Sequence, residues 1–155
     1  MNDDVWYFAY GSNLSTIQKE LRTSAIRTGD DRPRIALLAD FRFAFNKRGG
    51  KGQVFANVMA CPRNQVIGVV YRCKPSTVET MSGFEGGYER RTVVVVIDDN
   101  TSVEAITYVA MKKNVVDDAR PTDEYLTRIV DGAIQHGLPP DYIEKIKLLA
   151  SASKD

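Results

Sequence analysis

Near its N-terminus the chain reads Val5-Trp6-Tyr7-Phe8-Ala9-Tyr10-Gly11-Ser12-Asn13-Leu14. The first six of these residues are aromatic, β-branched or small, which predicts a short buried strand over Val5 to Tyr10. Gly11-Ser12-Asn13 breaks that strand. A helix is expected directly afterwards, from about Ser15, with Gln18 as its partner in a capping box. The stretch therefore predicts a strand that passes through a polar turn into a helix.

Further strands are predicted where apolar residues alternate with polar ones or where β-branched residues form runs. Phe41, Phe43 and Phe45 show the alternation most clearly, and they indicate a strand with one buried face. We expect strands over Arg34–Asn46 (one strand or two), Val54–Ala60, Val66–Cys73, Tyr88–Ile97 and Val103–Met111. A polar turn at Pro62 to Gln65 is expected to join the second of these to the third, and a turn at residues 98–100 makes the last two a hairpin.

Helices are predicted in the middle of the chain and in its last third. We expect them over Pro75–Gly83, over Pro121–His136, and from Pro140 to about Leu149, with Gly137 stopping the second. The strands fall in adjacent runs and do not alternate with helices. This order favours an α+β fold with a largely antiparallel or closed sheet over a Rossmann-type sheet.

Composition and charge exclude several classes of protein. The 155 residues include 21 Lys and Arg against 20 Asp and Glu, which gives a formal net charge of +1. We therefore expect one domain spanning residues 1–155, and no nucleic-acid partner. Two cysteines and one histidine, without CxxC or HxxxH spacing, argue against a zinc site. The N-terminus has no basic region and no apolar run approaches a membrane span of roughly 20 residues, so we expect a cytoplasmic protein with no membrane partner.

Two short segments contain residue types suited to chemistry. The junction at Gly11-Ser12-Asn13 presents backbone N–H groups and polar side chains that suit a carboxylate or phosphate, although a capped turn explains the same residues. Glu85 lies between Phe84 and Gly86-Gly87. A carboxylate beside apolar surface has a raised pKa and suits general acid–base work, and the alternative is a solvated loop glutamate.

Other candidate sites have weaker support from the sequence. Ser12 lacks a G-x-S-x-G context and His136 lies far along the chain on a late helix, which argues against a hydrolase triad. The segment Lys47 to Gly52 (KRGGKG) lacks the phosphate-binding pattern of a P-loop, so a flexible solvated hairpin is the simpler interpretation.

Four groups of motifs follow one another along the chain. They are Tyr7-Phe8-Ala9-Tyr10-Gly11-Ser12-Asn13-Leu14; Phe43–Arg48 with Ala56-Asn57-Val58; Val66–Tyr71 with Glu85-Gly86 and Tyr88-Glu89-Arg90; and Pro121-Thr122-x-x-Tyr125 with Gly132-Ala133 and Gly137-Leu138-Pro139-x-x-Tyr142. Together they resemble the gamma-glutamylcyclotransferase-like family over nearly the whole chain. One departure is that only Gly86-Gly87 separates Glu85 from Tyr88, where many members carry a longer insert.

The resemblance implies an α+β fold, a small mixed and largely antiparallel β-barrel with packed helices. It implies a small-molecule gamma-glutamyl substrate, no cofactor and no metal. The family pattern makes Glu85 the catalytic acid/base, while Tyr10 to Leu14 hold the glutamyl α-carboxylate and amine. The substrate-binding residues expected on this basis are Tyr7, Phe8, Ala9, Tyr10, Gly11, Ser12, Asn13, Leu14, Tyr88 and Tyr125. We expect a monomer or a homodimer.

The reaction implied by the resemblance is an intramolecular acyl transfer. The glutamyl α-amine attacks its own γ-carbonyl, and 5-oxoproline forms as an amine or amino acid leaves. Glu85 removes a proton from the ammonium and returns it to the leaving nitrogen. Two alternatives remain open from the sequence: a non-catalytic module that binds a small metabolite with the same loop, and a nucleic-acid accessory that uses Lys47–Gly52 and Arg90-Arg91.

Overall fold

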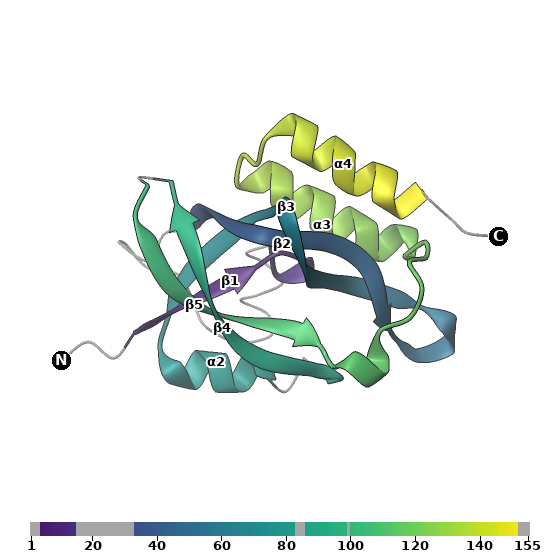
Figure 1. The fold of residues 1–155 in the computed structure, drawn as a ribbon, viewed down its shortest axis with the longest axis horizontal. Helices are drawn as coiled ribbons and strands as arrows, with labels where there is room; N and C mark the ends of the chain where they lie inside the picture. The colour runs from purple at the N-terminus through teal and green to yellow at the C-terminus, as the bar shows by residue number, and fades with distance from the viewer. Residues whose placement is uncertain (1–3, 15–32, 83–85, 99, 152–155) are drawn as a thin grey trace.

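A computed structural model describes residues 4–14, 33–82, 86–98 and 100–151. Within these ranges five strands close into a barrel in the order β1-β3-β2-β4-β5 (Figure 1). The strands are β1 (Val5–Ala9), β2 (Arg34–Arg48), β3 (Val54–Cys73), β4 (Tyr88–Ile97) and β5 (Ser102–Ala110). Every pairing is antiparallel except the one between β1 and β5. The predicted α+β fold with a small mixed, largely antiparallel barrel is confirmed.

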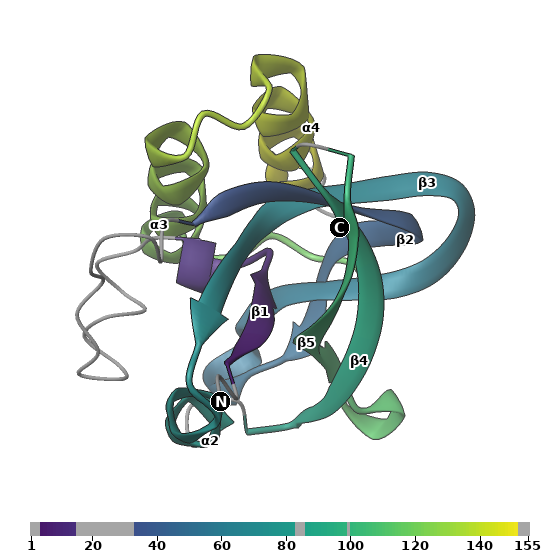
Figure 2. The ribbon, with the colours of Figure 1, turned by 90° about the vertical axis from the view of Figure 1, so that its left-hand side faces the viewer.

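The helices pack around the outside of the barrel. They are α2 (Pro75–Ser82), α3 (Asp123–Gln135) and α4 (Pro140–Ser151), with single 3₁₀ turns η1 (Ser12–Leu14), η2 (Gly50–Gly52) and η3 (Lys112–Asn114). In both ribbon views α3 and α4 lie together on one side, and α2 lies at the opposite end (Figure 2). Over the described ranges, each helix is too short or too polar to cross a bilayer. The helix expected from Ser15 falls outside the described residues.

One expectation about the strands was wrong: β3 is a single strand through the polar residues 62–65. Its register against β2 runs from Gln65, opposite Ala39, directly to Ala60, opposite Phe41. The residues between them bulge around Asp40, whose carboxylate accepts a hydrogen bond from the backbone N–H of Arg63 at 3.1 Å. Because Asp40 and Arg63 both adopt positive φ, the polar residues form an irregular bend and the chain does not reverse there.

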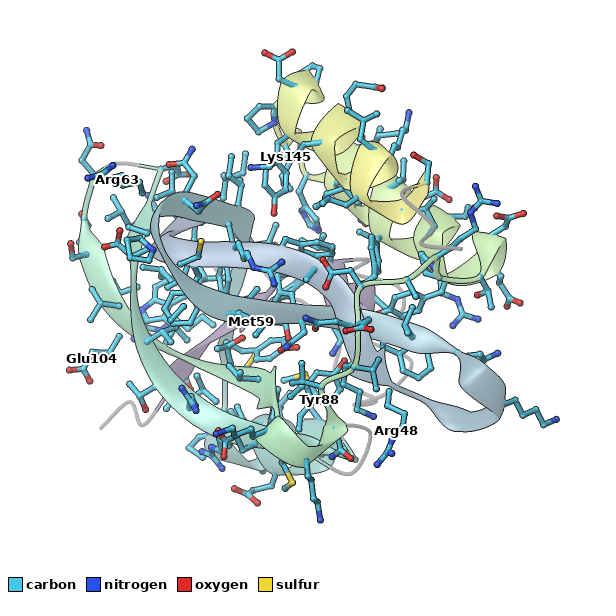
Figure 3. All side chains as sticks on the ribbon, turned by 45° about the vertical axis from the view of Figure 1, so that its right-hand side comes forward. Arg48, Met59, Arg63, Tyr88, Glu104 and Lys145 are labelled. Atoms are coloured by element: carbon cyan, nitrogen blue, oxygen red, sulfur yellow. The ribbon has the colours of Figure 1, made fainter. Side chains whose placement is uncertain are left out.

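The core fills the barrel and extends under the helices. Phe8, Tyr71 and Ile129 are among its fully buried side chains. A Cβ on Gly68 would lie 2.3 Å from the carbonyl oxygen of Ala9, so only glycine permits the close approach of β3 to β1. Charged side chains such as Glu104 and Lys145 point outward around this core (Figure 3).

Candidate active site

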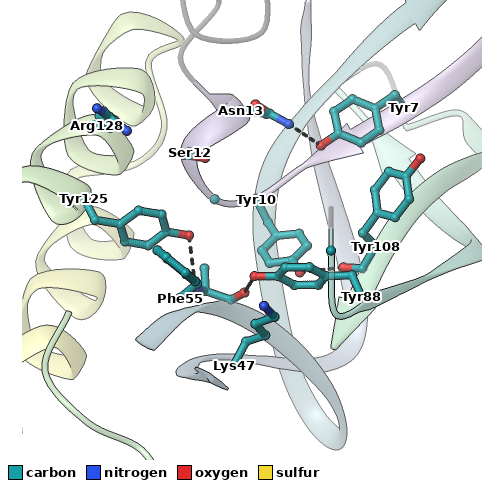
Figure 4. A pocket seen from close by; sticks show the side chains of 13 residues that line it. Tyr7, Tyr10, Ser12, Asn13, Lys47, Phe55, Tyr88, Tyr108, Tyr125 and Arg128 are labelled. Carbon is teal, nitrogen blue, oxygen red and sulfur yellow. Dashed lines mark hydrogen bonds between the residues drawn. The ribbon is translucent and has the colours of Figure 1, made fainter. Parts of the chain in front are cut away.

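A pocket of about 300 Å³ is lined by the end of β1 and the loop after it, by helix α3, and by residues of strands β2 to β5. Its size is at the lower end of the range for small-molecule sites. Several separate segments of the described chain contribute to its wall (Figure 4), and the lining residues are Tyr7, Tyr10, Gly11, Ser12, Asn13, Lys47, Phe55, Ala56, Gly86, Tyr88, Tyr108, Tyr125 and Arg128.

A buried tyrosine of β3 fixes the backbone of the loop that follows β1. Tyr71 Oη lies 3.1 Å from the carbonyl oxygens of both Asn13 and Leu14, and 3.4 Å from Nε2 of His136. The Asn13 side-chain amide donates a hydrogen bond to Tyr7 Oη at 3.0 Å. These contacts tie the polar loop to β1, β3 and the end of α3, so its backbone presents a fixed surface to the pocket.

At Gly11 the same loop comes close to Ala56 of β3 and Tyr125 of α3, which form the facing wall of the pocket. A Cβ at this position would lie 3.3 Å from Cβ of Ala56 and 3.4 Å from Oη of Tyr125. The first distance is slightly shorter than ordinary van der Waals contact and the second is at its lower limit, so a side chain at Gly11 would push Ala56 by a few tenths of an ångström and touch the Tyr125 hydroxyl. The small size of Gly11 therefore lets the loop lie close to Ala56 and to the Tyr125 hydroxyl.

Two tyrosines hold a single residue of β3 on the facing wall. The backbone N–H of Ala56 donates to Tyr125 Oη at 3.0 Å, and Tyr88 Oη donates to the Ala56 carbonyl at 2.7 Å (Figure 4). Tyr125 lies in the first turn of α3 because Thr122 caps that helix, its side chain accepting from the Tyr125 N–H. The ring of Phe55 packs edge-on against Tyr125 with centroids 5.0 Å apart. The wall is therefore rigid on both sides of Ala56.

Lys47 places a buried ammonium group in the pocket wall. Its Nζ lies 5.1 Å from the ring centroid of Tyr88 and 5.7 Å from that of Phe55, within cation–π range of both. Gly87, with φ of +86°, leaves space for it, because a Cβ there would lie 2.8 Å from Nζ. The Gly87 carbonyl in turn accepts from the Met111 N–H and from the Asn114 side chain, each at 3.0 Å.

Most of the residues predicted to bind substrate lie around this pocket. They are Tyr7, Tyr10, Gly11, Ser12, Asn13, Tyr88 and Tyr125. Phe8, Ala9 and Leu14 lie instead in the hydrophobic core, almost fully buried, where they support the loop without lining the pocket. Glu85 lies outside the described residues; Gly86, the residue bonded to it, lines the pocket.

Several lining residues were missed by the sequence analysis. Lys47 was assigned to a solvated loop, although the two-residue period of Phe43 and Phe45 extends to it and was a usable signal. Tyr108 and Arg128 gave no such signal, because an isolated side chain on an element acquires a role only when the fold brings its partners to it.

Comparisons with known proteins identify relatives over nearly the whole chain. Residues 65–146 match the model of the AIG2-like family. The gamma-glutamylcyclotransferase of Mus musculus is 33% identical over 150 residues, covering 92% of this chain and 77% of that protein. The gamma-glutamylcyclotransferase of Homo sapiens is 31% identical over 149 residues with the same coverage. A solved structure of a gamma-glutamyl cyclotransferase superposes with a TM-score of 0.82 at 29% identity, covering 98% of this chain and 90% of that one.

Proposed function

This chain belongs to the AIG2-like, gamma-glutamylcyclotransferase family, and on that premise we propose that its pocket converts a gamma-glutamyl compound into 5-oxoproline and a free amine or amino acid. One structural observation carries the proposal beyond the family relationship. The polar loop at Gly11–Asn13 and the tyrosines of β4 and α3 come from distant parts of the sequence and meet around one pocket. Several of the residues that the family pattern singles out thus line one pocket, which supports the proposal.

The polar loop is the proposed binding site of the glutamyl head group. Ser12 and Asn13 are buried at the pocket wall, and the close approach of Gly11 to Ala56 narrows the pocket beside them. Arg128 lies on the α3 side of the same loop and adds positive charge for a carboxylate (Figure 4). A glutamyl chain held there folds back so that its α-amine meets its γ-carbonyl, and this proximity supplies much of the acceleration.

Glu85 is the proposed acid/base residue. The α-ammonium group is not nucleophilic, so Glu85 first takes a proton from it. The amine then forms a bond to the γ-carbon, and the bond from that carbon to the leaving nitrogen breaks as Glu85 returns the proton to that nitrogen. The ring nitrogen gives up its second extra proton, which passes through Glu85 to the departing amine, so the neutral amide of 5-oxoproline forms and the amine leaves as an ammonium ion. The atoms balance without water or an external reductant, and the step as written uses no cofactor. The position of Gly86 in the pocket wall supports this role for its neighbour.

Tyr88 and Tyr125 are proposed to hold the pocket wall in the position that aligns the substrate for cyclisation. Tyr125 and Tyr88 fix the Ala56 peptide from its N–H and its carbonyl side. Displacing this wall by about 1 Å is enough to cost a large part of the rate in a reaction that depends on alignment.

The test is direct product analysis with purified protein. Gamma-glutamyl-L-alanine is incubated with the protein, and 5-oxoproline and alanine are quantified by mass spectrometry. The proposal predicts equal amounts of both products, released at a rate proportional to protein concentration. Thermal stabilisation by the substrate without release of either product would overturn it and leave a binding module in its place.

A further inference from the structure

A second cavity, of about 120 Å³, lies between helix α4 and the barrel strands β2 and β3. Both ribbon views show α4 lying over these two strands (Figure 1 and Figure 2). None of the residues that line this cavity lines the candidate active-site pocket. Its volume is well below that of a typical small-molecule site, but it is enough for a ligand of a few heavy atoms. The cavity is therefore a separate place with room for a small ligand or ion.

Tyr142 of α4 brings a buried polar group to this cavity. Only 7% of the surface of Tyr142 is exposed, and its hydroxyl has no hydrogen-bond partner among the described residues. The Ile67 backbone lies beside this hydroxyl without forming a hydrogen bond of normal geometry. An unsatisfied buried hydroxyl costs free energy, and native proteins contain few of them. A ligand that accepts a hydrogen bond in the cavity gives this group a partner.

The charged residues that line the cavity indicate the chemistry of such a ligand. Lys145 lies nearly one turn after Tyr142 on α4, is exposed, and forms no ion pair with another described residue. Arg42 of β2 contributes a guanidinium group, whose Nη1 lies 3.5 Å from a carboxylate oxygen of Asp118. Because both partners of that ion pair are partly exposed, the pair is weak, and the guanidinium has further N–H groups to donate. Two cations and a hydroxyl donor suit an anion with oxygen acceptors.

We propose that this cavity is a second ligand site, which binds a small oxyanion, a carboxylate or a phosphate, through the Tyr142 hydroxyl, Lys145 and Arg42. The phenol O–H donates to one oxygen of the anion, while the ammonium and guanidinium groups offset its negative charge. Apolar side chains that include Phe43 and Ile146 form the rest of the wall, and they strengthen these polar contacts by excluding water.

The bound anion joins the helical layer to the barrel. Tyr142 and Lys145 belong to α4, whereas Arg42 belongs to β2, so one ligand contacts both layers. An anion that binds only the folded protein stabilises it by mass action. The site is independent of the proposed cyclisation, because none of its residues lines the pocket in which that reaction is placed.

The test is a solution NMR titration of isotope-labelled protein with sodium phosphate and, separately, with sodium acetate, at an ionic strength held constant with sodium chloride. Backbone amide signals of residues 64–67 and 142–149 are expected to shift and to saturate with one Kd. Tyr142→Phe and Lys145→Met are each expected to weaken that Kd about tenfold, the usual range for a hydrogen bond to a charged group. Lys147→Met, on the same helix and paired with Glu144, is the matched control and should bind as wild type does. The tighter of the two anions identifies the preferred oxyanion.

The contrary outcomes are specific to this site. Shifts that fail to saturate in the wild-type protein, or the same Kd in wild-type protein and Tyr142→Phe, would overturn the proposal. So would binding that is lost in Arg128→Met, which alters the active-site pocket, and retained in Tyr142→Phe. Tyr142→Phe keeps the ring and removes only the unsatisfied hydroxyl, so it is expected to fold and carries the test if circular dichroism shows that Lys145→Met does not.

Discussion

The hydroxyl of Tyr125 lies 3.0 Å from the backbone nitrogen of Ala56, a residue 69 positions earlier in the chain. This hydrogen bond joins the first turn of α3 to the pocket face of β3. Gly11 approaches both groups, so the loop after β1, the barrel wall and the C-terminal helices converge at one point. The pocket depends on this junction, and each of its parts has a measurable consequence.

Removing the Tyr125 hydroxyl is the first prediction. Tyr125→Phe leaves the Ala56 N–H without its acceptor and frees the pocket wall, so we expect a loss of about 1–2 kcal/mol in unfolding free energy. We also expect kcat/KM for 5-oxoproline release to fall roughly tenfold to a hundredfold. Urea denaturation and the product assay measure the two effects. Wild-type activity in this variant would show that the junction does not order the site.

A side chain at Gly11 is the second prediction. Gly11→Ala places a Cβ slightly too close to Ala56 and in contact with the Tyr125 hydroxyl, so Ala56 must give way by a few tenths of an ångström, which disturbs its hydrogen bond to Tyr125, and activity is expected to drop about tenfold. Stability should change by less than about 1 kcal/mol, because the lower freedom of the unfolded chain offsets the crowding. The matched control is Gly50→Ala, where a Cβ meets nothing within 4 Å. Equal activity in the two variants would contradict the crowding argument.

The third prediction concerns a buried hydroxyl away from the pocket. Tyr142 Oη on α4 is buried and makes no hydrogen bond of normal geometry within the described structure, although the Ile67 backbone lies close enough to oppose part of its pKa shift. Because an unsatisfied buried hydroxyl costs free energy, Tyr142→Phe is expected to raise the unfolding free energy by roughly 1 kcal/mol. Its 5-oxoproline release should equal that of wild type, which makes it a second control for Tyr125→Phe. A destabilised variant would show that the hydroxyl has a partner.

The fourth prediction concerns the pH dependence of stability, and it also depends on Tyr142. Burial raises the pKa of Tyr142 far above its ordinary value of 10.0, so above that pH the unfolded chain gives up this proton while the folded protein keeps it. The unfolded state then binds fewer protons, and stability must fall as pH rises beyond about 10. The stability advantage of Tyr142→Phe over wild type should therefore widen between about pH 9 and pH 11. A constant difference across that range would contradict the assignment.

Local patterns in the sequence predicted much of the fold because they report local physics. The strand at Val5–Ala9, the helix that opens at Pro140, and the stop at Gly137, which adopts φ of +72°, follow from propensity and backbone sterics alone. The continuity of β3 was not predictable in this way. It depends on Asp40 of another strand accepting from the Arg63 N–H, a contact that no pattern within residues 54–73 contains.

The residues of the candidate site also divide into those that the sequence indicated and those that only long-range packing brings to the pocket. The Gly11–Asn13 loop was visible as an unusual junction, and Tyr88 and Tyr125 entered through the family resemblance. Lys47 was not recognised, because a lysine shortly before a Gly-Gly pair is usually solvated and only the packing of Tyr88, Phe55 and Gly87 around it makes it buried. Long-range packing therefore decides which of these residues belong to the pocket wall.

In the proposed reaction, Glu85 transfers the protons of the cyclisation. The most direct measurement is the rate of 5-oxoproline release from gamma-glutamyl-L-alanine by wild-type protein, by Glu85→Gln and by the control Glu89→Gln, whose glutamate forms an exposed ion pair with Arg91. We expect a fall of roughly 10²-fold or more in kcat for Glu85→Gln in a folded protein, and near wild-type turnover for Glu89→Gln. Equal rates for all three proteins would contradict it.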